Sequence, residues 1–298
     1  MKTIDTLAED IYHVLDSDQD HETDEDNIAA ASAALGDSFV RATSKRTGKR
    51  EFGKLWASDI GKPCLRQHNY RFNEPEKGEK LSGHTKFKFL YGELLEESVL
   101  CLAREAGHTI NSEQVRVETP IDGWTVSGRI DAIIDNTLID VKSTSSYGYK
   151  KYKEGIDSSN DSFGYREQLG FYSHYGFPDL TDTGFVFIDK QNGHICYTQC
   201  DVPSRDELES KIRNIITAVE GPEDDAPRAF APEPFGKSGN LKLPIGCSYC
   251  DFRKHCYRGS NGGRGLRTFI YSHGPVYLTH VTQEPRVPEV TDDELQSK

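Results

Sequence analysis

The sequence has no apolar run of the about 18 residues that a membrane-spanning helix needs, so we expect no helix across a membrane. Its N-terminus carries no apolar region followed by a small-residue cleavage site, which is the pattern of a secretory signal peptide. It also lacks the Gly-x-x-x-x-Gly-Lys-Ser/Thr motif of P-loop motors. We therefore expect a cytoplasmic protein that is not part of a motor.

Apolar residues are scarce as well, at 35% of 298 residues, and a formal net charge of -12 argues at first against a nucleic-acid partner. The charge is unevenly distributed, however. Residues 1–26 hold ten acidic residues against one lysine, and residues 284–298 hold five against two basic residues. The centre of the chain is close to neutral, and residues 37–54 within it are basic. This distribution is compatible with DNA binding by the centre.

Residues 124–143 carry the most informative pattern. Valine and isoleucine alternate with polar residues over 124–134 and 137–143, which predicts two strands joined by a tight turn at Asp135 and Asn136. Asp131 interrupts an otherwise apolar part of the first strand. Asp140 and Lys142 are two residues apart on the second strand, so their side chains leave the same face of the sheet.

Two carboxylates and an ammonium group at one end of a hairpin predict a cation site with a proton-handling lysine beside it. A carboxylate buried among apolar residues costs several kcal/mol unless it is paired or binds a metal. The alternative is a surface hairpin on which Asp140 and Lys142 form a salt bridge, because a motif this short often occurs by chance.

The order of Asp131, Asp140 and Lys142 resembles the core of the PD-(D/E)XK nucleases. The resemblance implies that the two aspartates, with the carbonyl group of Val141, bind Mg²⁺ or Mn²⁺. It also implies that the lysine positions the attacking water and helps to deprotonate it. Many members of this family have glutamate where this chain has Asp140.

A helix predicted over residues 86–106 supplies a further acidic residue. Gly92 and Glu96 match the Gly-x-x-x-His/Glu element of the RecB-like and phage-type members of the family, whose acid or histidine completes the metal shell. An all-oxygen set of Glu96 and the two aspartates suits Mg²⁺ or Mn²⁺. The alternative is that Glu96 belongs to a solvated helix face, as we expect for Glu93 and Glu97.

Two further segments are expected to bind DNA. Residues 143–161 are rich in serine, tyrosine, lysine and glycine, which predicts either a mobile lid that binds a single strand or an ordinary exposed loop. A helix is predicted over residues 165–175, and it resembles the Gln-x-x-x-Tyr element with which RecB-type nucleases contact DNA. The expected DNA-binding residues are Arg129, Lys150, Lys151, Gln168 and Tyr172. A second hairpin and a helix over 206–220 are predicted to follow.

The cysteines near the C-terminus are spaced C-x2-C-x5-C, at Cys247, Cys250 and Cys256. In a protein expected to be cytoplasmic, this spacing favours a metal site over disulfides. Three thiolates need a fourth partner, for which Cys64 is the candidate and His255 a weaker one. The remaining cysteines are interpreted as core or surface thiols: Cys101, Cys196 and Cys200.

One cysteine before the predicted core and C-x2-C-x5-C after it resemble the iron-sulfur branch of the RecB-like nucleases, such as the CRISPR-associated adaptation exonuclease and the AddB nuclease subunit. The resemblance implies a structural [4Fe-4S] cluster held by four cysteines. Zinc bound by the same thiolates is the alternative.

These features together predict an α/β protein with a restriction-endonuclease-like mixed sheet flanked by helices. The expected segments are an acidic stretch (1–26), a helical and basic region (27–85), the nuclease core (86–220), the cysteine region (221–260) and an extension (261–298), with an added strand over 269–281 and a disordered acidic tail from Pro285.

The function expected from the resemblance is that of a metal-dependent DNA exonuclease of a bacterial or phage-infected cell. Its substrate would be single-stranded DNA or DNA ends, with recombination, replication or CRISPR-adaptation proteins as partners. The alternatives are a zinc-stabilised endonuclease and a non-catalytic DNA-binding module.

Overall fold

The computed structural model describes residues 2–16, 22–44, 50–272, 274–291 and 294. The chain forms two compact units. The sheet unit draws on residues 1–48, 52–62 and 83–213, and the cysteine unit on residues 49–51, 63–82 and 214–298. Each unit therefore combines segments that lie far apart in the sequence.

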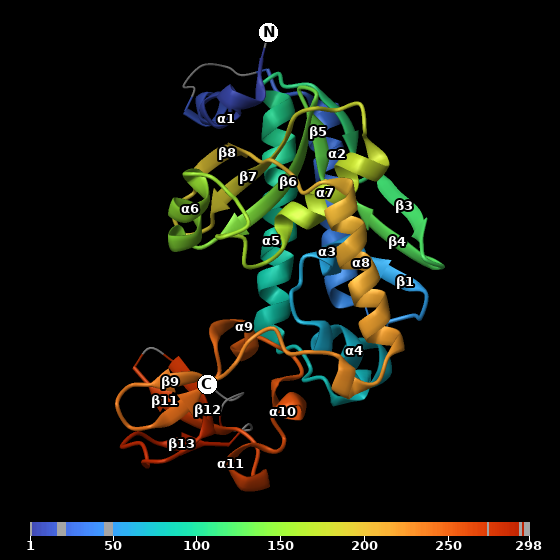
Figure 1. The fold of residues 1–298 in the computed structure, drawn as a ribbon. Helices are drawn as coiled ribbons and strands as arrows, with labels where there is room; N and C mark the ends of the chain where they lie inside the picture. Colours follow the sequence, from blue (N-terminus) through green and yellow to red (C-terminus); the bar gives the residue numbers. More distant parts are fainter. Residues whose placement is uncertain (1, 17–21, 45–49, 273, 292–293, 295–298) are drawn as a thin grey trace. The chain divides into compact units, whose positions relative to one another are not determined.

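A five-stranded mixed sheet forms the centre of the sheet unit, in the order β2-β5-β6-β7-β8 (Figure 1). β6 and β7 pair in parallel, and the other neighbours pair antiparallel. The strands are β2 (Ile110–Glu113), β5 (Ala132–Ile134), β6 (Thr137–Thr144), β7 (Thr183–Asp189) and β8 (Ile195–Gln199). The predicted second hairpin is thus present as β7 and β8.

The predicted turn at Asp135 and Asn136 is confirmed. Both residues have positive φ angles, +47° and +64°, which is the backbone of a type I′ hairpin turn and suits aspartate and asparagine. This turn sets the register that pairs Ile134 with Thr137 and Ala132 with Ile139. The residues of β6 therefore alternate between the two faces of the sheet as the sequence predicts.

The prediction of one continuous strand over residues 124–134 is wrong. β4 (Trp124–Arg129) ends before Ile130 and belongs to a separate three-stranded sheet with β1 (Lys54–Trp56) and β3 (Arg116–Ile121). The break is stabilised by backbone hydrogen bonds, because the amide of Ile130 donates to the Val115 carbonyl and Gln114 donates to the Asp131 carbonyl. The chain thus passes from one sheet to the other at Asp131.

Helices cover one face of the central sheet. α5 (Gly83–Glu105) and α1 (Leu7–Asp16), which follows the 3-10 turn η1 (Ile4–Thr6), bury leucine, isoleucine and valine against β5, β6 and β7. α2 (Glu25–Thr43) packs on α5, and Asp24 caps its N-terminus. The predicted apolar face of α5 is buried only in its C-terminal half, because Phe87 and Phe89 are exposed.

The other face of the sheet lies under α7 (Tyr165–Gly176), which confirms the predicted helix. The prediction of a loop over residues 143–161 is wrong in part, because α6 (Ser146–Lys153) lies within it. Ser145 caps α6 by accepting from the Gly148 amide, and Tyr149 and Tyr152 are buried. These buried rings stabilise the helix beyond what its composition indicates. Short α3 (Ala57–Ile60) contacts α7, and α8 (Arg205–Glu220) follows β8.

The cysteine unit contains α4 (Leu65–Asn73) and η2 (Pro75–Lys77), and α4 is bonded to segments nearer the C-terminus. Gln67 donates to Asp251, Asn69 donates to the Ala218 carbonyl, and the rings of Tyr70 and Phe252 are in contact. These hydrogen bonds attach residues 63–82 to residues 214–298. The remaining short helices are η3 (Glu223–Asp225), α9 (Ile245–Ser248), α10 (Arg253–Cys256) and α11 (Ser260–Gly263).

The extension at 261–298 differs from its prediction. The single strand expected over 269–281 is a hairpin of two strands, and residue 273 lies outside the described residues. The tail from Pro285 was predicted to be disordered, but it contains a short strand at Glu289 and Val290. The Arg267 guanidinium stabilises this strand by pairing with Glu289, and it also pairs with Glu284 just before the tail. The antiparallel sheet here comprises β9 (Glu233–Phe235), β10 (Asn240–Lys242), β11 (Arg267–Tyr271), β12 (Gly274–His280) and β13 (Glu289–Val290). Among the described residues, none of the helices has the length and apolar character needed to cross a membrane.

Candidate active site

Asp140 is the most buried acid of the predicted site. It lies on β6 with its side chain on the face opposite Ile139 and Val141, and it is 1% exposed. Its Oδ1 forms an ion pair with Nζ of Lys142, while no hydrogen-bond donor in the described part of the chain reaches Oδ2. The alternative of a surface hairpin is contradicted by this burial, although its salt bridge between Asp140 and Lys142 is present, and a buried carboxylate oxygen is left for another ligand.

Asp131 reaches the same strand from the break between the two sheets. Its Oδ2 accepts a hydrogen bond from the Val141 amide at 2.7 Å. Burial raises the pKa of Asp131 well above its usual range, and the nearby charges of Asp140 and Glu96 raise it further. The two predicted aspartates thus lie close together. The amide of Val141, the residue between Asp140 and Lys142, holds the Asp131 carboxylate beside β6.

Glu96 joins this group from α5. Nε2 of Gln114 donates to its Oε1 at 2.9 Å, and Gln114 lies in the backbone break opposite Asp131. Burial raises the pKa of Glu96 to about 7 against the pull of Lys142, and Asp140 adds to the rise. Glu96 is thus half-buried and hydrogen-bonded to Gln114, unlike a carboxylate on a fully solvated helix face.

Lys142 is held as a cation at the centre of the group. Burial lowers its pKa, but Asp140 and Asp131 outweigh burial, so the pKa ends above its usual range. Its Nζ also lies 5.3 Å from the centre of the Tyr165 ring, an arrangement that stabilises a cation. Burial raises the pKa of the Tyr165 phenol to about 12, so the ring is neutral.

A divalent cation suits the donors that these residues offer. Burial, and after it the charges of the neighbouring acids, raises the pKa values of Glu96 and Asp131, and a bound cation would offset both effects. Three carboxylates supply only oxygen, and the unsatisfied Oδ2 of Asp140 is buried. Their oxygens are more widely spaced than those of Glu74, Glu223 and His255, the set in the described residues whose ligand atoms lie within 4.8 Å of one another.

The set of Glu74, Glu223 and His255 lies in the cysteine unit and is already paired. Nε2 of His255 is 3.3 Å from Oε2 of Glu74, and the Tyr70 hydroxyl donates to Glu223 at 2.7 Å. Arg258 pairs with Glu223 as well. Neighbouring protein groups thus account for this cluster without a metal.

The pH dependence of stability follows from Glu96. Its folded pKa of about 7 exceeds the 4.5 of an unperturbed glutamate, so the folded state binds more protons than the unfolded state between these values. The unfolding free energy should therefore fall as pH rises from about 4.5 to about 7. Melting curves of the metal-free protein against pH should show this slope.

Glu96→Gln is the control for this prediction, because it removes one titrating group and should reduce the slope to the part that the raised pKa of Asp131 contributes. Mn²⁺ should raise the melting temperature of the natural protein more at pH 8 than at pH 5, since binding must displace the proton. Equal slopes in the two proteins would contradict the pKa shift.

Tyr172 and Gln168 lie inside the sheet unit. Tyr172 is 3% exposed, and its hydroxyl accepts from the Arg129 amide and from Nε2 of Gln168, both at 3.2 Å. A Cβ at Gly128 would lie 2.6 Å from this hydroxyl, so only glycine allows the contact. The pair therefore fixes the end of β4 two residues before Asp131, and DNA contact by these side chains stays a prediction.

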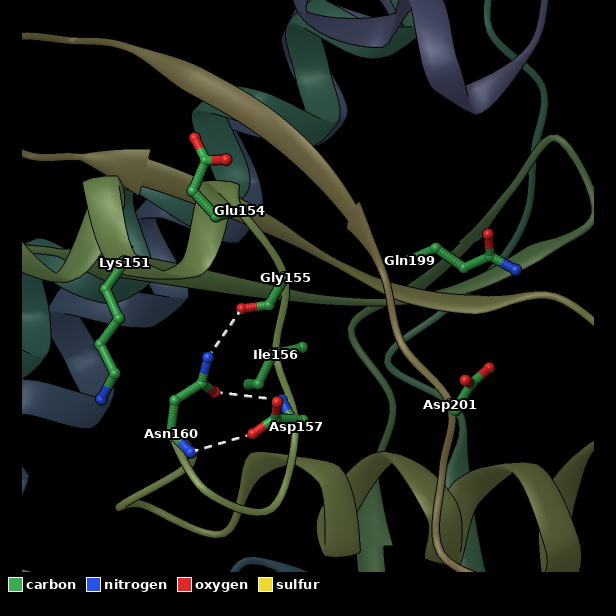
Figure 2. A pocket seen from close by; sticks show the side chains of 8 residues that line it. All are labelled: Lys151, Glu154, Gly155, Ile156, Asp157, Asn160, Gln199 and Asp201. Carbon is green, nitrogen blue, oxygen red and sulfur yellow. Dashed lines mark hydrogen bonds between the residues drawn. The ribbon is translucent and has the colours of Figure 1, made fainter.

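Of the predicted basic DNA contacts, Arg129 and Lys150 have exposed side chains. Lys151 lies on α6 with Nζ 5.2 Å from the Tyr152 ring, and it lines a pocket of about 360 Å³ (Figure 2). Glu154, Asp157 and Asp201 line the same pocket, so its net charge does not favour a phosphate. The acids around Lys142 are not part of it.

Tyr165 is a site residue that the sequence pattern did not reveal. It begins α7 one turn before Gln168, and this spacing is the signal that would have pointed to it. Its ring touches Lys142 on one side and approaches Phe185 on the other. Tyr165 therefore links the lysine to the core.

All four predicted cluster cysteines lie in the cysteine unit. Burial raises the pKa of Cys247 to about 11 and that of Cys250 to about 12, and Cys64 is close enough to raise both further. Nε of Arg228 donates to Sγ of Cys256 at 3.0 Å, a contact that stabilises a thiolate. Cys101, Cys196 and Cys200 are buried thiols, as expected.

No family model matches this chain, and no curated protein matches it. Seven chains of solved structures match this chain, among them the following two. The crystal structure of the protein SSO0001 is 16% identical, with 74% of this chain and 92% of that chain covered and a TM-score of 0.44. An alkaline exonuclease from Laribacter hongkongensis is 15% identical, with 56% and 88% covered and a TM-score of 0.37. Likenesses at this level carry no functional conclusion.

Proposed function

We propose that this protein is a divalent-metal-dependent DNA nuclease that hydrolyses phosphodiester bonds, acting as an exonuclease on single-stranded DNA or DNA ends. The observation that carries the proposal is the proximity of four groups: Asp131 accepts from the Val141 amide, Asp140 pairs with Lys142, and the Glu96 carboxylate is close enough to interact with both members of that pair. Three acids from separate segments share a partly buried place with a single lysine, and a divalent cation would offset the negative charge that the lysine leaves uncompensated.

Mg²⁺ or Mn²⁺ would be held by Glu96, Asp131, Asp140 and the carbonyl group of Val141. When bound, the ion supplies polarisation of the phosphate and acidification of a water molecule. Lys142 is charged while Asp140 faces it, so it can orient the nucleophile and hold the phosphate oxygens. Lys142 can accept a proton only after it has lost its own. That requires another group to neutralise the charge of Asp140, which otherwise keeps the lysine protonated.

We also propose a structural [4Fe-4S] cluster held by Cys64, Cys247, Cys250 and Cys256. Four thiolates on zinc at about 2.3 Å would lie roughly 3.8 Å apart. No three of these sulfur atoms lie within 4.8 Å of one another in the part of the chain that the structure describes. The proposal is supported by the cysteine spacing and by the presence of all four cysteines in the cysteine unit, and zinc bound by the same thiolates is the alternative. His255 faces Glu74 instead, so it remains a weaker ligand candidate than Cys64.

The proposed activity is tested by digestion of end-labelled single strands and duplexes. Mg²⁺ or Mn²⁺ should support cleavage, and chelation by EDTA should abolish it, because the acids alone cannot neutralise the charge of the reacting phosphate. Re-addition of Mn²⁺ should restore the rate. Binding of DNA without cleavage at any metal concentration would favour the alternative of a non-catalytic DNA-binding module.

The biological setting expected for such an enzyme is recombination, repair or CRISPR adaptation. Labelling either end of the strand would also give the polarity of digestion, and a circular single strand would separate the proposed exonuclease from an endonuclease.

A further inference from the structure

An exposed aromatic ring stands beside the candidate active site. Phe163 lies in the segment before α7 and is 61% exposed. It stacks on Tyr165 with ring centres 5.3 Å apart and an angle of 21° between the planes. The Tyr165 ring in turn lies 5.3 Å from Nζ of Lys142. Two rings therefore lead from the surface to the catalytic lysine.

The backbone that carries Phe163 is fixed. The Asp161 carboxylate accepts hydrogen bonds from the amides of Phe163, Gly164 and Arg166, at 3.3, 2.9 and 2.8 Å. Gly164 has a φ angle of +73° and packs so closely on Gly61 that a Cβ would lie 2.2 Å from its Cα. The ring is therefore held in place before any ligand arrives, which reduces the entropy lost on binding.

The Tyr165 ring of this stack packs against aromatic residues of the core. The Tyr165 ring lies 6.1 Å from Phe185 and 6.3 Å from Tyr152, and Tyr152 stacks on Phe187 at 4.7 Å. Phe185 and Phe187 pair with Asp140 and Lys142 in the parallel register of β6 and β7. The aromatic stack thus extends from the core along the same face of the sheet as the catalytic residues.

We propose that Phe163 is a stacking platform for an unpaired base next to the scissile phosphate, so that the substrate is single-stranded or frayed DNA. This inference rests on the proposed function. The bases of a duplex are covered on both faces by their neighbours, whereas an unpaired base offers a face to an aromatic ring. The Phe163 ring lies 5.3 Å from the Tyr165 ring, which lies 5.3 Å from Nζ of Lys142, so a base stacked on Phe163 would belong to a nucleotide near the scissile phosphate.

The test uses oligonucleotides with 2-aminopurine at successive positions, bound in Ca²⁺ to the full-length protein. In the natural protein, stacking should quench the fluorescence of a base near the cleavage position. Phe163→Ala should remove this quenching and weaken binding of the single strand by about 5- to 150-fold. Phe163→Trp should retain both, which shows that the ring and not the fold is responsible.

The matched control is Phe39→Ala, because Phe39 is a 51% exposed ring on α2 with no role in the site. It should leave quenching and affinity unchanged. In Mn²⁺, an abasic nucleotide at the quenched position should slow cleavage by the natural protein and have no further effect on Phe163→Ala.

Unchanged quenching and affinity in Phe163→Ala would overturn the platform. An equal loss of affinity for a blunt, fully paired duplex would also overturn it, because no base is free to stack there. If the natural protein cleaves no DNA, the nuclease proposal fails, while the fluorescence in Ca²⁺ still decides whether Phe163 binds a base.

Discussion

Replacement of Asp140 by asparagine is expected to lower the rate of DNA cleavage by about 10²- to 10⁴-fold while the protein stays folded. Asparagine has nearly the same shape but no charge, so it cannot compensate a divalent cation. It also removes the ion pair that holds Lys142. The measurement is single-turnover digestion of an end-labelled single strand in Mn²⁺, beside a circular dichroism melt.

Lys142→Gln and Asp131→Asn should show losses of similar size, because each removes a charge from the same group. Effects of residues that act together are not additive, so the double variants should be little worse than the single ones. Asp122→Asn is the matched control: Asp122 is a half-exposed acid paired with Arg213. Full activity in a folded Asp140→Asn protein would refute the site.

Replacement of Cys250 by alanine is expected to remove a brown absorbance near roughly 400 nm and to lower the melting temperature on the order of 10 °C. One missing ligand of four leaves the cysteine unit without the group that is proposed to join residues 63–82 to residues 214–298. Iron and sulfide analysis of protein purified without oxygen should agree with the absorbance.

Cys196→Ala is the control for this variant, because Cys196 is a buried thiol on β8 in the sheet unit. It should keep the colour and lose only the modest stability of one buried sulfur atom. The natural protein could instead be colourless and contain one equivalent of zinc after purification without oxygen. That result would show that the four cysteines bind zinc and not an iron-sulfur cluster.

Local rules were sufficient for several parts of the fold. The hairpin turn followed from Asp135 and Asn136, which tolerate positive φ angles, and α5 and α7 followed from apolar residues at helical spacing. α6 was missed because serine, lysine and glycine indicate a loop, whereas the burial of Tyr149 and Tyr152 that stabilises it is a tertiary effect.

In the candidate site too, features that depend on the local backbone were predicted, and features that depend on the packing of distant elements were not. Alternation along a strand placed Asp140 and Lys142 on one face, because that depends on the backbone alone. The burial of Tyr172 and the contact of Tyr165 with Lys142 depend on where α7 lies against the sheet. The break at Ile130 was hidden because an apolar run looks alike whether it continues a strand or passes to another sheet.

The position of Asp131 at the crossing between two sheets limits how this chemistry can be moved to another protein. β5 and β6 carry Asp140 and Lys142 by themselves, but the backbone that presents Asp131 is paired with residues 114–115 and continues into β4. A graft of the hairpin alone would therefore transfer two of the four groups. The smallest portable catalytic module includes the β3–β4 ribbon and the part of α5 that carries Glu96.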